Sequence, residues 1–159
     1  MSPKVFLMCG KICSGKSVHA DELRRKYRAV VLSVDEITLA LFGQDAGNRL
    51  DDYAAKTKAY LYRKSLEILG SGISVILDWG FWTKEERAYA KRFYESRNIP
   101  CELHYIDIDD REWLRRLQKR NTAVRRHETD AYYVDEGLAA KFEAVFEPPE
   151  PWEIDVRIS

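Results

Sequence analysis

The sequence predicts an α/β domain in which a mostly parallel, five-stranded sheet lies between helices on both faces. Five short apolar runs rich in β-branched residues recur along the 159 residues, and stretches with the apolar spacing of amphipathic helices separate them. Regular alternation of this kind is typical of parallel sheets, because parallel strands need long crossover connections. The predicted strands cover residues 5–9, 29–34, 73–77, 101–108 and 153–158.

The helices are predicted from apolar residues three or four positions apart. The first three strands are continuously apolar, as strands covered on both faces are, whereas the last two alternate in the manner of edge strands. Gly-Ser-Gly at 70–72 and the proline-rich stretch 147–151 end helices. No repeat or linker interrupts the pattern, so residues 1–159 are expected to form one domain. The apolar helical positions are Ala20, Leu23 and Tyr27; Tyr89, Ala90 and Phe93; Trp113, Leu114 and Leu117; and Leu138, Phe142 and Val145.

The composition excludes several classes of protein. Twenty-six basic residues balance 26 acidic ones, so no overall charge draws the chain to long nucleic acids or to membranes. Apolar stretches are shorter than the roughly 20 residues of a membrane span. The apolar run at the N-terminus is also too short for a signal peptide. The three cysteines form no C-x-x-C pair, so we expect a reducing, cytoplasmic location without disulfides or zinc.

A phosphate-binding loop follows the first predicted strand. Gly10, Gly15, Lys16 and Ser17 match G-x-x-x-x-G-K-[ST], between a strand and a helix as the mechanism requires. Backbone N–H groups of residues 11–17 and the start of the helix are expected to surround the β-phosphate of ATP. Lys16 would bridge the β- and γ-phosphates, and the Ser17 hydroxyl would bind Mg²⁺. The candidate nucleotide-binding residues in the loop are Gly10, Lys11, Ile12, Cys13, Ser14, Gly15, Lys16, Ser17 and Val18.

Cys13 has two interpretations. A thiol at the start of a helix is a candidate reactive group, because the helix dipole stabilises a thiolate. Alternatively, it is a small residue that a tight loop tolerates, and this interpretation is favoured. Cys9 and Cys101 lie within strands and are expected to be inert core thiols.

Acidic residues follow the second and third predicted strands. Asp35 is the candidate general base, because a carboxylate at this edge of the sheet can accept the proton of an attacking hydroxyl. Its alternative role is a helix N-cap, with Glu36 beginning a short helix. Asp78 is the candidate Mg²⁺ ligand beside Ser17. The aromatic residues after it either stack on an acceptor or form a hydrophobic lid over the sheet edge; they are Trp79, Phe81 and Trp82.

A basic segment follows the fourth strand. Residues 115–127 hold six Lys or Arg, one His and no acidic residue. In a chain that is otherwise balanced, this concentration favours an Arg-rich lid over about 115–132 that clamps transferring phosphate. Arg116 and Arg120 are the first candidates for phosphate contact and catalysis, with Arg125 and Arg126 behind them. The alternative is a solvated basic helix end, and His127 has no predicted role.

The long helical stretch 51–69 is expected to overhang the acceptor side of the site. Its flank carries Arg49, Lys56, Tyr60 and Arg63 as possible contacts. These charges are equally compatible with a solvated face.

These motifs together resemble those of the small P-loop kinases, which include polynucleotide kinase, chloramphenicol phosphotransferase and the zeta toxins. The resemblance rests on "CGKICSGKS", "LSVDEI", "VILDWGFWTKEER", "DREWLRRLQKRN" and "VFEPPEPWE", in that order. It implies a three-layer P-loop NTPase fold, ATP with Mg²⁺, and transfer of the γ-phosphoryl group to a hydroxyl. By position it implies Asp35 as base, Arg116 and Arg120 as lid arginines, and the turn at 147–153 beside adenine. Ile12-Cys13 and Trp79-Gly80 depart from the usual pattern, so the acceptor contact after Asp78 is not inherited.

The expected function is an ATP-dependent kinase of a small hydroxylated molecule such as an antibiotic, a nucleoside or a sugar. A nucleic-acid-end kinase is the alternative, although it would need a basic channel in this neutral chain. A third possibility is an ATP-binding regulatory protein that has no phosphoryl acceptor. The fold alone does not choose between these acceptors.

Overall fold

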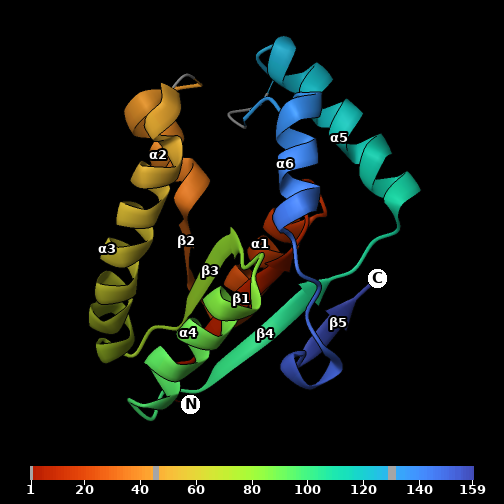
Figure 1. The fold of residues 1–159 in the computed structure, drawn as a ribbon. Helices are drawn as coiled ribbons and strands as arrows, with labels where there is room; N and C mark the ends of the chain where they lie inside the picture. Colours follow the sequence, from red (N-terminus) through yellow and green to blue (C-terminus); the bar gives the residue numbers. More distant parts are fainter. Residues whose placement is uncertain (1, 45–46, 129–131) are drawn as a thin grey trace.

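The chain forms a parallel sheet with the strand order β2-β3-β1-β4-β5 (Figure 1). The computed structural model describes residues 2–44, 47–128 and 132–159. Every strand pair in this sheet is parallel, as predicted. The strands are β1 (Val5–Gly10), β2 (Val30–Ser33), β3 (Val75–Gly80), β4 (Cys101–Ile106) and β5 (Val156–Ile158).

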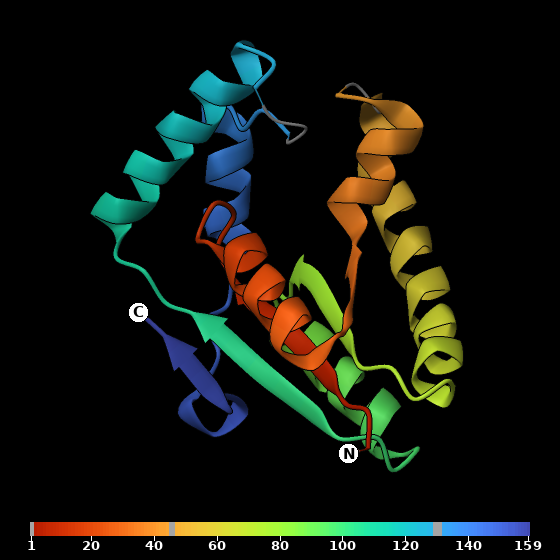
Figure 2. The ribbon, with the colours of Figure 1, turned by 180° about the vertical axis from the view of Figure 1, so that it is seen from behind.

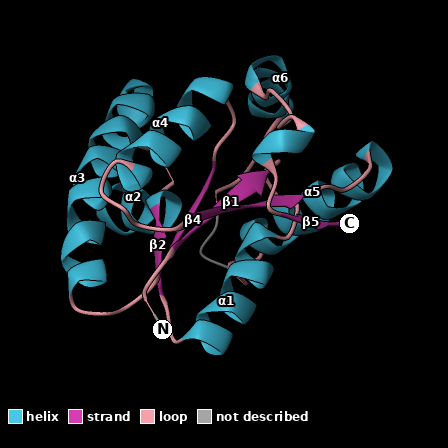
Figure 3. Cartoon of the chain, turned by 90° about the horizontal axis from the view of Figure 1, so that it is seen from below, coloured by secondary structure: helices cyan, strands magenta, loops and turns pink. Residues whose placement is uncertain are grey.

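Helices cover both faces of the sheet and rise beyond the carboxyl ends of its strands. Figure 3 shows α1 on one side of the sheet and α3 with α4 on the other. Figure 2 shows α5 and α6 standing together beyond the sheet, across from α2 and α3. The helices are α1 (Lys16–Tyr27), α2 (Val34–Phe42), α3 (Leu50–Gly70), α4 (Lys84–Glu95), α5 (Asp110–Arg125) and α6 (Glu136–Val145), with short 3₁₀ turns at Gly47–Arg49 and Pro151–Glu153.

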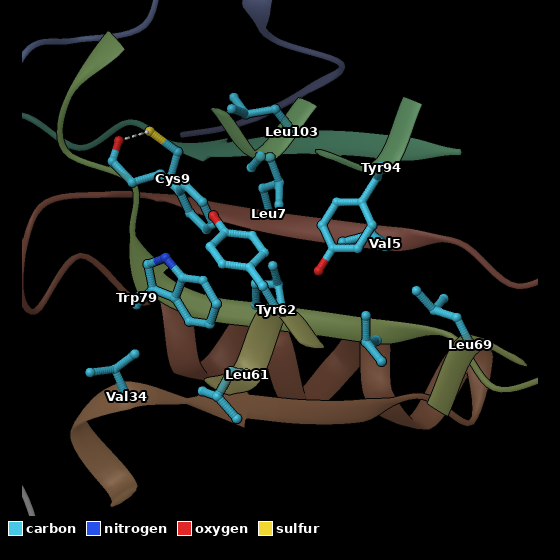
Figure 4. Packing of buried hydrophobic residues seen from close by; sticks show 14 of the residues in the cluster. Val5, Leu7, Cys9, Val34, Leu61, Tyr62, Leu69, Trp79, Tyr94 and Leu103 are labelled. Carbon is cyan, nitrogen blue, oxygen red and sulfur yellow. Dashed lines mark hydrogen bonds between the residues drawn. The ribbon is translucent and has the colours of Figure 1, made fainter. Parts of the chain in front are cut away.

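Two hydrophobic clusters hold the three layers together. On one face, alternate residues of β1 and β3 pack against α3 and α4; Figure 4 shows Leu7, Tyr62 and Tyr94 among them. On the other face, Phe6, Met8 and Ile76 pack against α1. Because side chains alternate along a strand, a continuously apolar strand supplies both clusters at once. This is the burial predicted for β1 and β3.

The predicted positions of two strands were wrong. β2 lies at an edge of the sheet, and its Val30 is 38% exposed, although its apolar run predicted burial. β4 lies between β1 and β5, although its alternation predicted an edge strand. Its polar residues are tolerated there because they bind one another and their neighbours: Glu102 accepts from Lys4 at 2.9 Å and pairs with His104 at 3.0 Å.

Candidate functional site

A cleft lies beyond the carboxyl ends of the strands and is lined by residues of α2 and α3 and of α5 and α6. Figure 1 shows these two pairs of helices on opposite sides of the molecule. The volume of the cleft is about 2210 Å³, and its floor is formed by the loop between β1 and α1. Of the predicted site residues, those from Ile12 to Val18, Asp35, Asp78, Arg116 and Arg120 line this cleft. Gly10 and Lys11 lie in the loop but do not line it.

The loop has the backbone conformation of a phosphate-binding turn. Gly15 is the N-cap of α1 and has a φ of 101°. Because glycine has no side chain to cap the helix, the N–H groups of the first turn stay available to a bound phosphate. Cys13 also has a positive φ, 60°. Such a conformation is unfavourable for residues other than glycine, which explains why glycine often takes this position. Cys13 adopts it nevertheless. Departure from the usual Pro-Gly therefore leaves the left-handed turn intact.

Both motif glycines are also required by close packing. A Cβ atom at Gly10 would lie 2.9 Å from Ser14 Oγ and 3.1 Å from the carbonyl oxygen of Ile106. At Gly15, a Cβ atom would lie 2.9 Å from the guanidinium of Arg116. Larger residues at either position would therefore displace the loop or the arginine.

Lys16 and Ser17 lie at the start of α1, where two carboxylates approach them. Ser17 Oγ donates to Asp78 Oδ2 at 3.1 Å, and Lys16 Nζ donates to the carbonyl oxygen of Lys11 at 3.0 Å. Enclosure by the loop lowers the pKa of Lys16, while the nearby carboxylates of Asp78 and Asp35 partly oppose this effect. The four groups therefore share one electrostatic environment. Asp78 lies within β3, which continues to Gly80 and is longer than predicted.

The structure excludes the predicted alternative role for Asp35. The N-cap of α2 is Ser33, whose side chain accepts from the N–H of Glu36 at 3.2 Å, so the carboxylate of Asp35 is not needed there. Helix α2 also begins earlier than predicted, at Val34. Burial raises the pKa of Asp35 by removing water from around the carboxylate, and the positive charges of Lys16 and Arg120 oppose this rise. Asp35 therefore does not cap α2, and it lines the cleft.

Helix α5 is docked directly on the phosphate loop. Arg116 donates to the carbonyl oxygen of Ser14 at 2.6 Å and to Glu112 at 2.8 Å. Arg120 lies 3.1 Å from the Cys13 sulfur, and its Nε is buried without a hydrogen-bond partner among the described residues. Two guanidinium groups thus lie against the loop, as the spacing of four residues predicted. Arg115 and Arg116 together lower the pKa of Glu112 to about 2.

Trp113 contacts the phosphate loop, although the sequence predicted only that it lies on the apolar face of a helix. Its Nε1 donates to the carbonyl oxygen of Ile12 at 2.6 Å, and the ammonium of Lys11 lies 4.9 Å from its ring. Lys11 also pairs with Asp110 at 2.8 Å. Lys11 therefore attaches α5 to the loop and does not face the cleft. Trp113 and Ile12 are 101 residues apart in the chain, so no sequence pattern could have predicted this hydrogen bond.

Contacts also join the two walls of the cleft. Tyr132 donates to Thr38 Oγ1 of α2 at 2.7 Å, and Lys141 of α6 pairs with Asp51 of α3 at 2.9 Å. The segment around Val134 is held to α5 by a double hydrogen bond with Asn121. Of the predicted lid over 115–132, residues 115–125 belong to α5, and 129–131 lie outside the described residues. Its closure over phosphate stays a prediction.

Among the aromatic residues after Asp78, Phe81 is core and the other two reach the cleft. Phe81 is fully buried, and Trp79 stacks on it at 5.3 Å between ring centroids while also lining the cleft. Trp82 packs edge-on against Phe142 of α6 at 4.5 Å. The carbonyl of Phe81 accepts from the buried Arg87 at 2.9 Å, which holds this turn in place.

Helix α3 does line the cleft, but with a different face from the one predicted. Lys56, Tyr60 and Arg63 are absent from the lining, whereas Lys58 and Tyr62 belong to it. Lys56 and Tyr60 are exposed, which agrees with the solvated-face alternative. The turn at 147–153 does not line the cleft either, because Arg87 and Lys84 of α4 hold Glu153 at 2.9 Å and Glu150 at 3.3 Å. The adenine contact implied by the resemblance therefore has no support in the structure.

The donor set near Ser17 fits Mg²⁺. A hydroxyl and a carboxylate 3.1 Å apart are hard oxygen ligands of the kind that this ion prefers. The described residues contain no cluster of three His, Cys, Asp or Glu side chains that could hold a metal by themselves. Few protein ligands are expected for Mg²⁺, which usually binds through one or two side chains together with substrate phosphates.

The parallel sheet, the glycine-rich turn at a helix N-terminus and the Ser17–Asp78 contact define a P-loop nucleotide-binding fold. The profile of the AAA_33 family, described as an AAA domain, matches residues 5–149. The chain therefore belongs to this family of P-loop kinases. No match was found among curated protein sequences. No helix of the described residues is long and apolar enough to cross a membrane.

Solved structures with low sequence identity share the fold. A protein from Chloroflexus aurantiacus that has been proposed to be a kinase is 17% identical, with a TM-score of 0.74 over 99% of this chain and 88% of that chain. The APS kinase CysC of Mycobacterium tuberculosis, in complex with AMPPNP and APS, is 22% identical, with a TM-score of 0.68 over 99% and 88%. Kti12 of Chaetomium thermophilum, in complex with ADP-AlF3, is 16% identical, with a TM-score of 0.71 over 97% and 87%.

Proposed function

We propose that this protein is an ATP-dependent kinase that transfers the γ-phosphoryl group to a hydroxyl of a small molecule. The observation that carries the proposal is the convergence of the phosphate loop, Asp35, Asp78 and two α5 arginines on one cleft. Similarity to structures that hold AMPPNP or ADP-AlF3 supports ATP as the nucleotide.

In the proposed reaction, the acceptor oxygen attacks the γ-phosphorus and the bond between that phosphorus and the β,γ-bridging oxygen breaks. Asp35 takes the hydroxyl proton, ADP leaves with the bonding electron pair, and the acceptor becomes a phosphate ester. Asp35 suits this role because Ser33, and not Asp35, caps α2, and because Asp35 lines the cleft. A raised pKa makes its carboxylate a stronger base than an ordinary aspartate.

Lys16, Arg116 and Arg120 are proposed to hold the phosphate oxygens. Charge spreads over these oxygens during transfer, and fixed cations placed around them stabilise it. Arg116 and Arg120 now bind the carbonyl of Ser14 and the sulfur of Cys13, contacts that phosphate oxygens can replace within the same loop. Ser17 and Asp78 would hold Mg²⁺, which supplies further neutralisation of phosphate charge when bound.

A small acceptor is favoured over a nucleic acid because the cleft is charge-balanced away from the loop. Its far wall, on α3 and α4, carries both Lys58 and Glu86, which pair with each other at 2.8 Å. A polynucleotide would instead need a continuous basic track for its phosphates.

The test is an ADP-release assay with MgATP and a panel of hydroxylated metabolites, nucleosides, antibiotics and oligonucleotides with free ends. We expect at least one small molecule to raise ADP release above the rate with MgATP alone. Stimulation by oligonucleotides only, lost at higher salt, would favour the end-kinase alternative. An absence of stimulation by every compound, despite MgATP binding, would favour a regulatory ATP-binding role.

A further inference from the structure

One branch of the cleft lies between α3, α4 and the end of β3, away from the phosphate loop. Its lining residues form what we call the acceptor recess: Lys58, Tyr62, Trp79, Glu86 and Tyr89. A smaller cavity of about 270 Å³ opens beside it and shares four of these residues, Trp79 excepted. The same four side chains therefore border both cavities.

Among the described residues, two buried polar groups of the recess have neither a hydrogen bond nor an ion pair, whereas Glu86 Oε1 has the Lys58 ammonium beside it. Tyr62 is 6% exposed and Trp79 is 9% exposed, yet neither the Tyr62 hydroxyl nor Trp79 Nε1 is hydrogen-bonded within the described part of the chain. Figure 4 shows both groups at the end of the core where Cys9 lies, which is the carboxyl end of β1. Buried polar groups are nearly always hydrogen-bonded, so two orphans on the wall of one cleft point to a ligand that binds them.

Tyr94 shows how the same core treats a tyrosine that has only a structural role. Its hydroxyl is fully buried and lies 2.7 Å from Ser65 Oγ, with which it shares a hydrogen bond. The rings of Tyr62 and Tyr94 lie 6.1 Å apart in one cluster. The contrast makes the unpartnered hydroxyl of Tyr62 a feature of its position beside the cleft.

The charge of the recess is balanced and close to Asp35. Lys58 Nζ lies 2.8 Å from Glu86 Oε1, and the same lysine is near enough to Asp35 to favour the ionised form of that carboxylate. An anionic ligand would have to lie beside the Glu86 carboxylate, which disfavours it. A neutral ligand can donate hydroxyls to Glu86 and accept from Lys58, Tyr62 and Trp79.

An aromatic wall completes the recess. Tyr89 is 47% exposed, and its ring meets that of Tyr62 edge-on at 5.1 Å. Such a surface suits a ring with an apolar face and polar edges. Hydroxyl groups at those edges are the complement of the donors and acceptors around it.

We propose that the phosphoryl acceptor is an uncharged, polyhydroxylated ring compound, of the sugar or nucleoside class, bound in the acceptor recess by Tyr62, Trp79 and the Lys58–Glu86 pair. This inference rests on the proposed kinase function and adds the residues and the charge that select its substrate. Free sugars and nucleosides share the chemistry that the recess recognises. Their phosphorylated counterparts do not.

The experiment compares matched pairs of compounds by binding and by turnover. Free sugars, sugar alcohols and nucleosides are each tested beside the corresponding monophosphate, first for binding to the protein loaded with AMPPNP and Mg²⁺, and then for ADP release with MgATP. We expect the uncharged member of a pair to bind and to be phosphorylated. Preference for the phosphorylated members would overturn the recess proposal and leave kinase function standing. Binding of uncharged members with no ADP release from any of them would overturn the kinase function and the acceptor role, and would leave the recess only as a binding site. No binding and no release with any member would overturn the recess as a binding site as well.

The variant Tyr62→Phe tests the recess without disturbing the core. Loss of one neutral hydrogen bond to the acceptor is expected to raise its KM about 3- to 10-fold, while the KM for ATP stays unchanged. The melting temperature should not fall, because the deleted hydroxyl makes no hydrogen bond to any described residue. The matched control Tyr94→Phe should lower the melting temperature by a few degrees and leave the acceptor KM unchanged. Equal behaviour of the two variants would contradict the proposal.

A second variant tests the charge balance. Glu86→Gln leaves Lys58 unpaired and makes the recess positive, so phosphorylated compounds should gain affinity relative to their uncharged counterparts. An unchanged ratio would show that the Lys58–Glu86 pair does not select the acceptor.

Discussion

The hydroxyl of Ser17 donates to the carboxylate of Asp78 across 3.1 Å, which joins the phosphate loop to the end of β3. The two residues are 61 positions apart in the chain, and each was predicted separately as a Mg²⁺ ligand. Their contact fixes the side of the loop on which the ion is expected. It also gives the Mg²⁺ assignment a direct test.

Asp78→Asn and Ser17→Ala should each weaken binding of MgATP about 10- to 100-fold, which is the usual effect of changing groups that hold or orient a bound metal. Calorimetric titration with MgATP measures this loss. Titration with ATP in the presence of EDTA is the control, because the variants and the wild type should then bind alike. Equal weakening with and without Mg²⁺ would show that the two residues serve the loop and not the ion.

Arg116→Ala and Arg120→Ala should each reduce the rate of phosphoryl transfer about 10²- to 10³-fold, because each removes a cation from beside the phosphate loop. Single-turnover kinetics with MgATP and an acceptor measure the step. Arg111→Ala is the matched control, since it removes the same charge from α5 at a position that does not line the cleft. A comparable loss in the control would assign the effect to the overall charge of the helix.

A thiol reagent should modify Cys13 alone, and MgATP should protect it. Burial raises the pKa values of Cys9 and Cys101 to about 12, so both are protonated and unreactive at neutral pH. Cys13 lies in the phosphate loop and faces the cleft. Intact mass measurement with and without nucleotide counts the labels. Modification at a second cysteine, or labelling that nucleotide does not slow, would contradict the prediction.

Stability should decrease as the pH falls from 7.5 to 5.5, because of His19. Burial, together with the neighbouring His104 ring at 3.0 Å, lowers the pKa of His19. As the pH falls below about 6.5, His19 takes up a proton more readily in the unfolded chain than in the folded chain. Acid therefore favours unfolding. Melting curves across this range measure the slope. His19→Gln should flatten it, whereas the control His127→Gln at an exposed position should not.

Much of the fold could be predicted because its signals are local. The motif at Gly10–Ser17, the apolar runs and the helical spacing each depend on residues near one another in the chain. The order of the strands does not, since β1 pairs with β3 and β4 through long crossovers. The predictions that β2 is covered on both faces and that β4 is an edge strand were therefore both wrong. The polar residue Glu102 of β4 is paired with Lys4, which is distant from it in the sequence.

The residues that converge around the phosphate loop could be located from the sequence, whereas the residues of α3 that line the cleft could not. Lys16, Ser17 and Asp35 follow the carboxyl ends of strands and Asp78 lies near the carboxyl end of β3, where the topology of the fold brings side chains together. Selecting the cleft-facing residues of α3 requires the rotation of that helix about its axis, which packing of Leu61 and Leu69 against the sheet determines. Consequently Tyr60 was chosen in place of Tyr62.

The central claim is that Asp35 takes a proton from an acceptor hydroxyl during transfer from ATP. Wild-type protein and Asp35→Asn are incubated with ATP labelled in the γ-phosphate, Mg²⁺ and an accepted compound, and label in the acceptor is measured as a function of pH. The wild type should lose activity as the pH falls through the raised pKa of Asp35, since protonation removes the base.

Asp35→Asn should lower transfer about 10²- to 10⁴-fold and leave MgATP binding intact. It should also raise the melting temperature at neutral pH. Ionisation of a carboxyl group whose pKa is raised in the folded state destabilises the folded protein, and asparagine cannot ionise. Transfer of label by Asp35→Asn at the wild-type rate, with the same pH profile, would contradict the claim.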